Sequence, residues 1–188
     1  MGMFSRKDMI RLFGPLLVEQ LLAVLVGMAD VVMVAAVGET AVSGVALVDS
    51  ISVLVIQVLS AMATGGAVVC SQYIGKKKPD QACRAAGQLV LITAALSLLI
   101  AAVAFIGNRH LLRLIFGSVE TAVMDNAQTY FWFTAMSYPF LALYNSGAAL
   151  FRSMGNSKVS MKVSLAMNAI NVAGNALCVF GLHMGVEG

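Results

Sequence analysis

Four long runs without a charged side chain constrain this sequence most. Residues 50–75, 85–108, 126–151 and 163–186 contain no Asp, Glu, Lys or Arg over 26, 24, 26 and 24 residues. A helix needs about 20 predominantly apolar residues to cross the hydrocarbon core of a bilayer. We therefore expect each run to hold a membrane-spanning helix.

A fifth stretch, at 12–37, is equally apolar except for Glu19 and Asp30. The sequence thus predicts an all-α membrane protein with five spans, at about 12–37, 45–74, 84–107, 123–151 and 159–181. The longest connection is 108–120, where leucine and isoleucine surround Arg113. This pattern predicts a short helix lying at the outer membrane interface.

The composition excludes several classes of protein. Charged residues make up 11% of the chain and apolar residues 60%, whereas soluble domains are about 25% charged. The three cysteines form no C-x-x-C pair, so neither a disulfide framework nor a metal site is expected. The sequence contains no G-x-S-x-G and no H-E-x-x-H. We expect no enzyme, no nucleic-acid partner and no cofactor beyond a coupling ion.

The basic residues predict the orientation in the membrane. Ten of the twelve lie in the N-terminal segment and in the alternate connections at 76–84 and 152–162. Cytoplasmic loops carry an excess of Lys and Arg. The N-terminus is therefore predicted to be cytoplasmic.

Acidic residues inside spans are the first candidates for function. Asp30 lies within the first span, where a carboxylate is costly unless it faces a cavity or a partner; packing alone is the alternative. Glu19 lies eleven residues earlier, about three helical turns, and is predicted to project into the same interior. Asp49, near the start of the second span, is predicted to reach interfacial water.

Three amides in the last span form a second group of candidates. Asn168, Asn171 and Asn175 are three and four residues apart, so their side chains follow one helix face. Asn175 and Asp30 are predicted to lie at one depth, about 10 Å below the outer surface. Carboxylate and amide oxygens suit Na⁺ or a proton relay; amide bonding between helices is the alternative.

The fourth span and one glutamine supply further cavity candidates. Pro139 predicts a kink, and Tyr138 and Asn145 flank it. Gln57 is a single amide in the second span, a type that more often cross-links helices. Tyr130 and Trp132 are assigned to the outer aromatic belt.

The residues taken in order resemble the N-terminal half of a multidrug and toxic compound extrusion (MATE) transporter. Pro15, Gln20 and the run GMADVVMVAAVG at 27–38 are similar to that family's first helix. Further matches, in chain order, are GGAVVCSQYIG at 65–75, YPF at 138–140, LFRSMGN at 150–156, NAIN at 168–171 and GVEG at 185–188.

The resemblance implies a MATE-like helical bundle of which this chain forms a partial N-terminal lobe with five transmembrane helices. It implies an antiporter of the bacterial or archaeal plasma membrane that exports drugs or organic cations in exchange for H⁺ or Na⁺. Asp30 would be the coupling carboxylate and Asn171 its amide partner, with Na⁺ possible at these two residues. Where many members carry an acid one turn later, this chain has Asn175, which favours proton coupling.

Substrate or cavity candidates under this reading are Glu19, Gln20, Gln57, Tyr138, Pro139, Asn145 and Asn168. The expected partners are amphipathic or cationic small molecules, the lipid bilayer and a C-terminal lobe that this chain lacks. Two other functions stay open: a flippase for lipid-linked precursors with a related fold, and a membrane scaffold protein without transport.

Overall fold

The structure is a computed structural model that describes residues 6–182, without the side chains of residues 6–8, 11 and 12. The described residues form five α-helices and no strand. They are α1 (Arg6–Ala35), α2 (Glu39–Gly75), α3 (Pro79–Phe116), α4 (Thr121–Ser153) and α5 (Ser157–Ala176), and α5 continues into a π-helical segment at Leu177–Gly181. The all-α prediction is confirmed.

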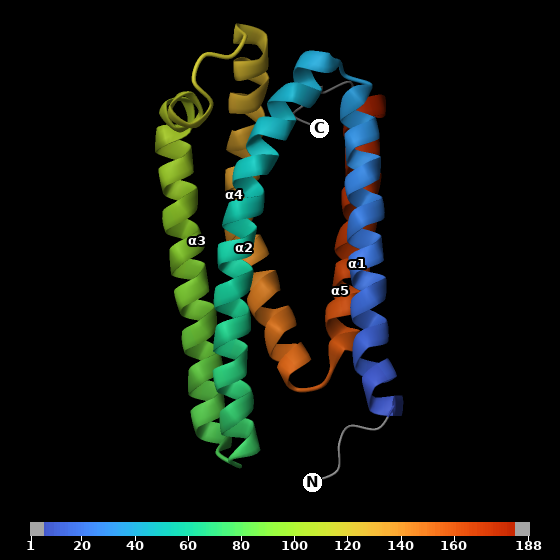
Figure 1. Cartoon of the computed structure of the whole chain (residues 1–188), viewed down its shortest axis with the longest axis vertical. Helices are drawn as coiled ribbons and strands as arrows, with labels where there is room; N and C mark the ends of the chain where they lie inside the picture. Colours follow the sequence, from blue (N-terminus) through green and yellow to red (C-terminus); the bar gives the residue numbers. More distant parts are fainter. Residues whose placement is uncertain (1–5, 183–188) are drawn as a thin grey trace.

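Short turns make the helices run alternately up and down (Figure 1). Gly117 and Gly155, with φ of +67° and +77°, follow α3 and α4. Glycine adopts this backbone region without steric cost, so it lets the chain leave a helix within a few residues. All five helices are therefore roughly antiparallel to their chain neighbours.

The helices fall into two groups. α2, α3 and α4 pack together, and α1 packs along α5 (Figure 1). The core of the larger group is apolar and consists of Val48, Ala104, Leu112, Met124, Ala127, Phe131, Ala135 and Tyr138. Fewer contacts join the two groups, through α1 with α2 and α4 with α5.

Small residues and hydroxyls hold α4 against its neighbours. A Cβ atom on Gly44 of α2 would lie 2.9 Å from the Ala127 backbone nitrogen, so the two helices touch there through their backbones. Thr93 and Ser146 share a hydrogen bond of 2.7 Å between α3 and α4. Such close packing and interhelical hydrogen bonding are typical of helix association in membranes.

Four helical segments in the described part of the chain are long and apolar enough to cross a membrane, Phe13–Ala35, Glu39–Gly75, Pro79–Phe116 and Ser157–Gly181. α4 is not one of them, although its 33 residues give about 50 Å at ~1.5 Å per residue. It contacts α2, α3 and α5, so its polar side chains face other helices and lipid does not have to accept them.

Two further details differ from the sequence prediction. The short helix expected within 108–120 is the continuous end of α3, which ends at Phe116. Its last turns are seen end-on in Figure 1 and lie across the bundle. The fifth span, predicted as one helix over 159–181, changes from α to π geometry after Ala176. The GVEG segment at 185–188 lies outside the described residues.

Candidate functional site

A cavity of about 530 Å³ lies between the two groups of helices, with walls from α1, α2, α4 and the end of α5. Its polar lining residues are Asp30, Asp49, Tyr130, Thr134, Asn171 and Asn175, and the rest of the wall is apolar, for example Val31, Met33, Val42 and Phe133. A mostly apolar cavity with a few convergent polar groups is the usual form of a small-molecule site.

Asp30 and Asn175 meet at this cavity. The Asn175 side chain donates a hydrogen bond of 3.0 Å to Asp30 Oδ1. It also donates one of 3.4 Å to Asn171 Oδ1, one turn earlier on α5. The contact forms because α1 and α5 run side by side and place the two residues at the same height. The Asn175 amide group thus presents hydrogen-bond donors to both oxygens.

Asp49 supplies a second carboxylate to the same cavity. It was predicted to reach interfacial water; its side chain is exposed, but it lines the cavity opposite α1 and α5. The Tyr130 hydroxyl donates to Asp49 Oδ1 at 3.4 Å. The cavity therefore carries two acidic groups, one from α1 and one from α2.

From the sequence we expected α4 to line the cavity, but through other residues of this helix. Tyr130 was assigned to the aromatic belt, and Thr134 was not considered. Both line the cavity, and the Thr134 hydroxyl donates to the Tyr130 carbonyl at 2.8 Å. Their spacing of four residues, which places them on one helix face, is the signal that could have identified this wall.

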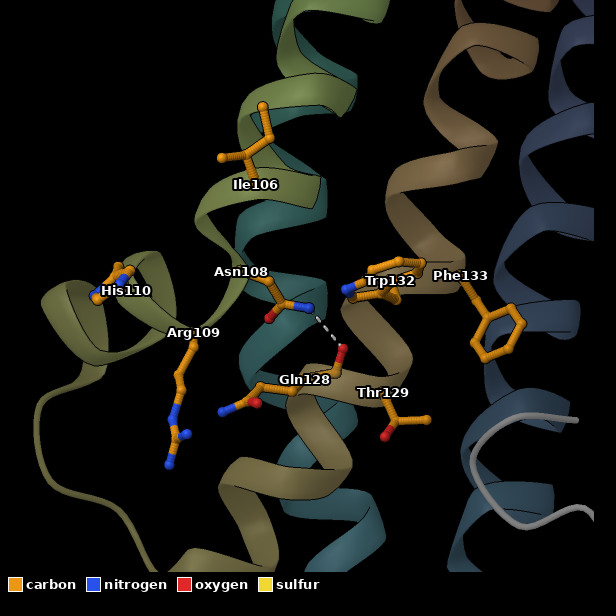
Figure 2. Close-up of a pocket in the computed structure, with 8 residues that line it drawn as sticks. All are labelled: Ile106, Asn108, Arg109, His110, Gln128, Thr129, Trp132 and Phe133. Carbon is orange, nitrogen blue, oxygen red and sulfur yellow. Dashed lines mark hydrogen bonds between the residues drawn. The ribbon is translucent and has the colours of Figure 1, made fainter.

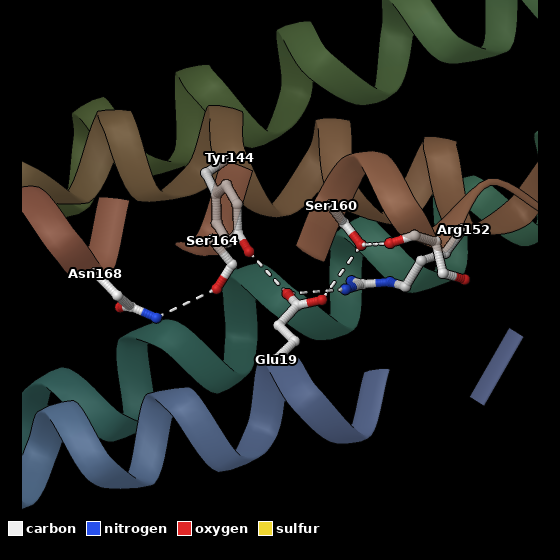
Figure 3. A network of polar contacts seen from close by, with 7 residues as sticks. Glu19, Tyr144, Arg152, Ser160, Ser164 and Asn168 are labelled. Atoms are coloured by element: carbon white, nitrogen blue, oxygen red, sulfur yellow. Dashed lines mark hydrogen bonds and ion pairs between the residues drawn. The ribbon is translucent and has the colours of Figure 1, made fainter. Parts of the chain in front are cut away.

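Glu19 faces the helices packed against α1, but it does not line the cavity that holds Asp30. Its carboxylate accepts hydrogen bonds from Tyr144 (2.7 Å) and Ser160 (3.2 Å), and Arg152 lies 3.6 Å away (Figure 3). The reason is depth: eleven residues of helix rise about 16 Å. Glu19 therefore lies near the opposite membrane face, where it joins α1 to α4 and α5.

The other predicted candidates do not line the cavity. Gln20 and Gln57 are exposed, and Asn145 is half-buried. Tyr138 is fully buried between α2 and α4, where its hydroxyl shares a hydrogen bond of 3.1 Å with Ser52. Asn168 donates to Ser164 at 3.4 Å, next to the Glu19 network (Figure 3). The lower part of α4 runs at an angle to its upper part (Figure 1), and Pro139 lies inside this helix.

No group of three or more His, Cys, Asp or Glu side chains suited to a metal ion occurs among residues 6–182. A Na⁺ ion at Asp30 and Asn171 would instead need amide and carboxylate oxygens. Asn175 turns its NH₂ group toward both of those oxygens, an arrangement that suits hydrogen bonding more than cation ligation.

A bundle of long apolar helices with an acidic cavity at span depth defines a multi-pass membrane protein. The family follows from sequence: residues 15–177 match the MatE family model, and the chain belongs to that family. The resemblance found in the sequence is thereby confirmed.

Comparisons with known proteins agree. The chain is 29% identical over 185 residues to the uncharacterized transporter YisQ of Bacillus subtilis, covering 96% of this chain and 40% of that protein. Its fold is similar to a crystal structure of MATE in complex with MaD3S, with a TM-score of 0.90, 18% identity and coverages of 96% and 40%. It is also similar to the structure of an outward-facing multidrug resistance MATE family transporter of the MOP superfamily. That comparison has a TM-score of 0.89 and 18% identity, and it covers 96% of this chain and 40% of the other. The chain spans about 40% of the length of these relatives.

Proposed function

We propose that this chain is part of a proton-coupled antiporter that exports organic cations or other amphipathic compounds. One observation carries the proposal: a carboxylate at span depth, Asp30, opens onto a cavity of about 530 Å³ and is held by an amide of a neighbouring helix. Membership of a transporter family fits this role better than catalysis.

Coupling would arise because a proton and a cationic substrate compete for the negative charge of the Asp30 carboxylate. A carboxylate inside a membrane is stable when it carries a proton or faces a cation. A cationic substrate bound near Asp30 favours loss of the proton, and a returning proton favours release of the substrate. Proton coupling is favoured over Na⁺ because Asn175 offers donors to Asp30 where Na⁺ would need another oxygen.

The membrane arrangement is part of the proposal. The positive-inside rule places the N-terminus and the connections at 76–78 and 154–156 in the cytoplasm, so the Asp30 cavity lies toward the outer face. We also propose that the working transporter pairs this lobe with a second one, because the relatives are more than twice as long as this chain.

Transport by the native gene product in proteoliposomes tests the proposal. With ethidium as the substrate, an imposed pH gradient is expected to drive export and an equal Na⁺ gradient to drive little. Asp30→Asn is expected to abolish the driven transport, because an amide cannot release a proton. The matched control Asp125→Asn changes an exposed carboxylate that does not line the cavity. Full coupled export by Asp30→Asn would sink the proposal.

A further inference from the structure

A second pocket, of about 570 Å³, lies where the end of α3 meets α4 (Figure 2). We propose that this pocket binds the headgroup of an anionic phospholipid that carries free hydroxyls, such as phosphatidylglycerol. The pocket lies on the predicted outer side of the membrane, at the level where α3 turns across the bundle. This inference does not depend on the transport proposal.

Two buried amide atoms without hydrogen-bond partners point to a missing ligand. Asn108 is 7% exposed, and its side-chain nitrogen donates to the Gln128 carbonyl at 2.8 Å. Its Oδ1 atom is buried and has no hydrogen-bond partner, and neither has the Gln128 Nε2 atom. Unsatisfied buried polar atoms are costly and rare, and an unseen bound group is one explanation for them. One of these atoms is an acceptor and the other a donor, and both residues belong to the wall of the same pocket.

A hydroxyl group fits this pair better than the alternatives. One O–H can donate to Asn108 Oδ1 and accept from Gln128 Nε2 at the same time. The ammonium of phosphatidylethanolamine can only donate, and the quaternary amine of phosphatidylcholine can do neither. A headgroup with free hydroxyls therefore satisfies both atoms.

Arg109 supplies the charge that an anionic lipid requires. It lines the same pocket, and its guanidinium extends toward the open side that the Gln128 amide also faces (Figure 2). Among residues 6–182, no described carboxylate lies within 4 Å of its guanidinium. A phosphodiester accepts two hydrogen bonds from a guanidinium in a favourable planar arrangement.

Apolar side chains continue the pocket where acyl chains would lie. Ile106, Trp132 and Phe133 line it and are exposed. Trp132 packs against Phe105 with ring centroids 3.6 Å apart, which fixes the indole at the rim. Tryptophan at the headgroup level with exposed aliphatic surface beside it is typical of a lipid interface. The pocket thus combines polar, basic and apolar side chains.

The single tryptophan of the chain, Trp132, makes the proposal directly measurable. The 188-residue chain is reconstituted in phosphatidylcholine bilayers that contain an equal small fraction of a brominated lipid. Brominated phosphatidylglycerol is expected to quench Trp132 fluorescence more than brominated phosphatidylcholine or phosphatidylethanolamine. Equal quenching by the three lipids would overturn the proposal.

Variants separate the pocket from general surface charge. Arg109→Gln and Gln128→Leu are each expected to weaken the relative affinity for phosphatidylglycerol about tenfold, the usual loss for a charge-assisted or buried hydrogen bond. Arg113→Gln removes a basic residue from the same end of α3 but outside the pocket, and is expected to keep the preference. If Arg113→Gln reduced the preference as much as Arg109→Gln, the attraction would be diffuse and the pocket assignment wrong.

Soluble glycerol phosphate separates a lipid from a free anion. It carries the same phosphate and hydroxyl groups without acyl chains, and is expected to leave the quenching unchanged. Relief of quenching by millimolar glycerol phosphate would show a site for soluble anions and contradict the lipid assignment. Arg109 is exposed, so its variant is expected to fold, and this can be checked by circular dichroism.

Discussion

Asp30 and Asn175 form the contact on which the proposed coupling depends. The amide donates at 3.0 Å from α5 to α1, at the wall of the cavity. Amide and carboxylate have nearly the same shape, so exchanging one for the other changes charge with little change in packing. This makes the pair the best place to alter the coupling ion without unfolding the protein.

Asn175→Asp is expected to shift transport toward Na⁺. A second carboxylate beside Asp30 repels the first unless a cation or a proton lies between them. In proteoliposomes, transport driven by a Na⁺ gradient is therefore expected to rise relative to transport driven by pH. Asn168→Asp, seven residues earlier on α5 and outside the cavity, serves as the control. An unchanged ratio in Asn175→Asp would argue against the proposed role of this position.

Glu19→Ala is expected to destabilise the protein by about 1–2 kcal/mol, the value of interhelical hydrogen bonds in membranes. The substitution removes the acceptor of the Tyr144 and Ser160 hydroxyls and the partner of Arg152. Its neighbour Gln20 is exposed, so Gln20→Ala is the control, expected to change the unfolding free energy by under 0.5 kcal/mol. Unfolding in mixed micelles provides the measurement. Equal stability of the two variants would contradict the structural role given to Glu19.

The sequence could predict only those parts of the site that depend on the position of a residue along its own helix. Asp30 and Asn175 could be matched because the rise per residue places both at about the same distance from the ends of their helices. The partners of Glu19 could not be predicted, because they come from α4 and α5 and its position on α1 says nothing about them. Asp49 and Tyr130 come from α2 and α4, and only the packing of those helices brings them to the cavity.

At the scale of the helices, α4 holds the larger group together. It is not among the candidate membrane spans, and ten of its residues are buried. Its contacts with α2 depend on the absence of a side chain at Gly44. The charge-free run at 126–151 predicted this helix, but not which of its residues pack against the other helices.

Gly44→Ala is expected to destabilise the protein by about 1–3 kcal/mol, the usual cost of overpacking. The new Cβ would lie 2.9 Å from the Ala127 nitrogen and from Asn126 Cβ, so backbone must move. Gly65→Ala on the same helix meets nothing within 4 Å and is expected to be neutral or slightly stabilising, because alanine favours helix. Thermal unfolding in detergent compares the two variants. A destabilised Gly65→Ala with an unaffected Gly44→Ala would contradict the observed α2–α4 contact.

Most of the element pattern was predictable and two details were not. Charge-free runs identified the helices because lipid penalises charge directly. The end of α3 could not be located, since a helix that turns into the interface has the same composition as a separate interfacial helix. The π geometry after Ala176 likewise has no composition of its own.

At the scale of the whole molecule, two helix groups enclose the cavity and share few contacts. The α1–α5 pair is joined to the rest through α1 with α2, through α4 with α5, and through the contacts of Glu19 with α4. This arrangement would let the cavity change shape as the pair moves relative to α2–α4. The direction in which the protein would move its substrate depends on which side of the membrane the cavity faces.

The orientation is expected to be N-terminus inside. In a background with Cys70, Cys83 and Cys178 replaced by alanine, Lys78→Cys should react with a membrane-impermeant maleimide only after the membrane is opened. Ser118→Cys, in the connection between α3 and α4, should react in intact cells. The reverse pattern would invert the topology and place the Asp30 cavity toward the cytoplasm.

The central claim is that Asp30 exchanges a proton for an organic cation, and the pH dependence of cation binding tests it most directly. Equilibrium binding of tetraphenylphosphonium to the native gene product is measured over a series of pH values, with Asp125→Asn as the control. Exchange of one proton per cation requires an affinity that rises about tenfold per pH unit while Asp30 is protonated in the free protein. Asp30→Asn is expected to bind with an affinity independent of pH. The same steep pH dependence in Asp30→Asn as in the wild type would contradict the account.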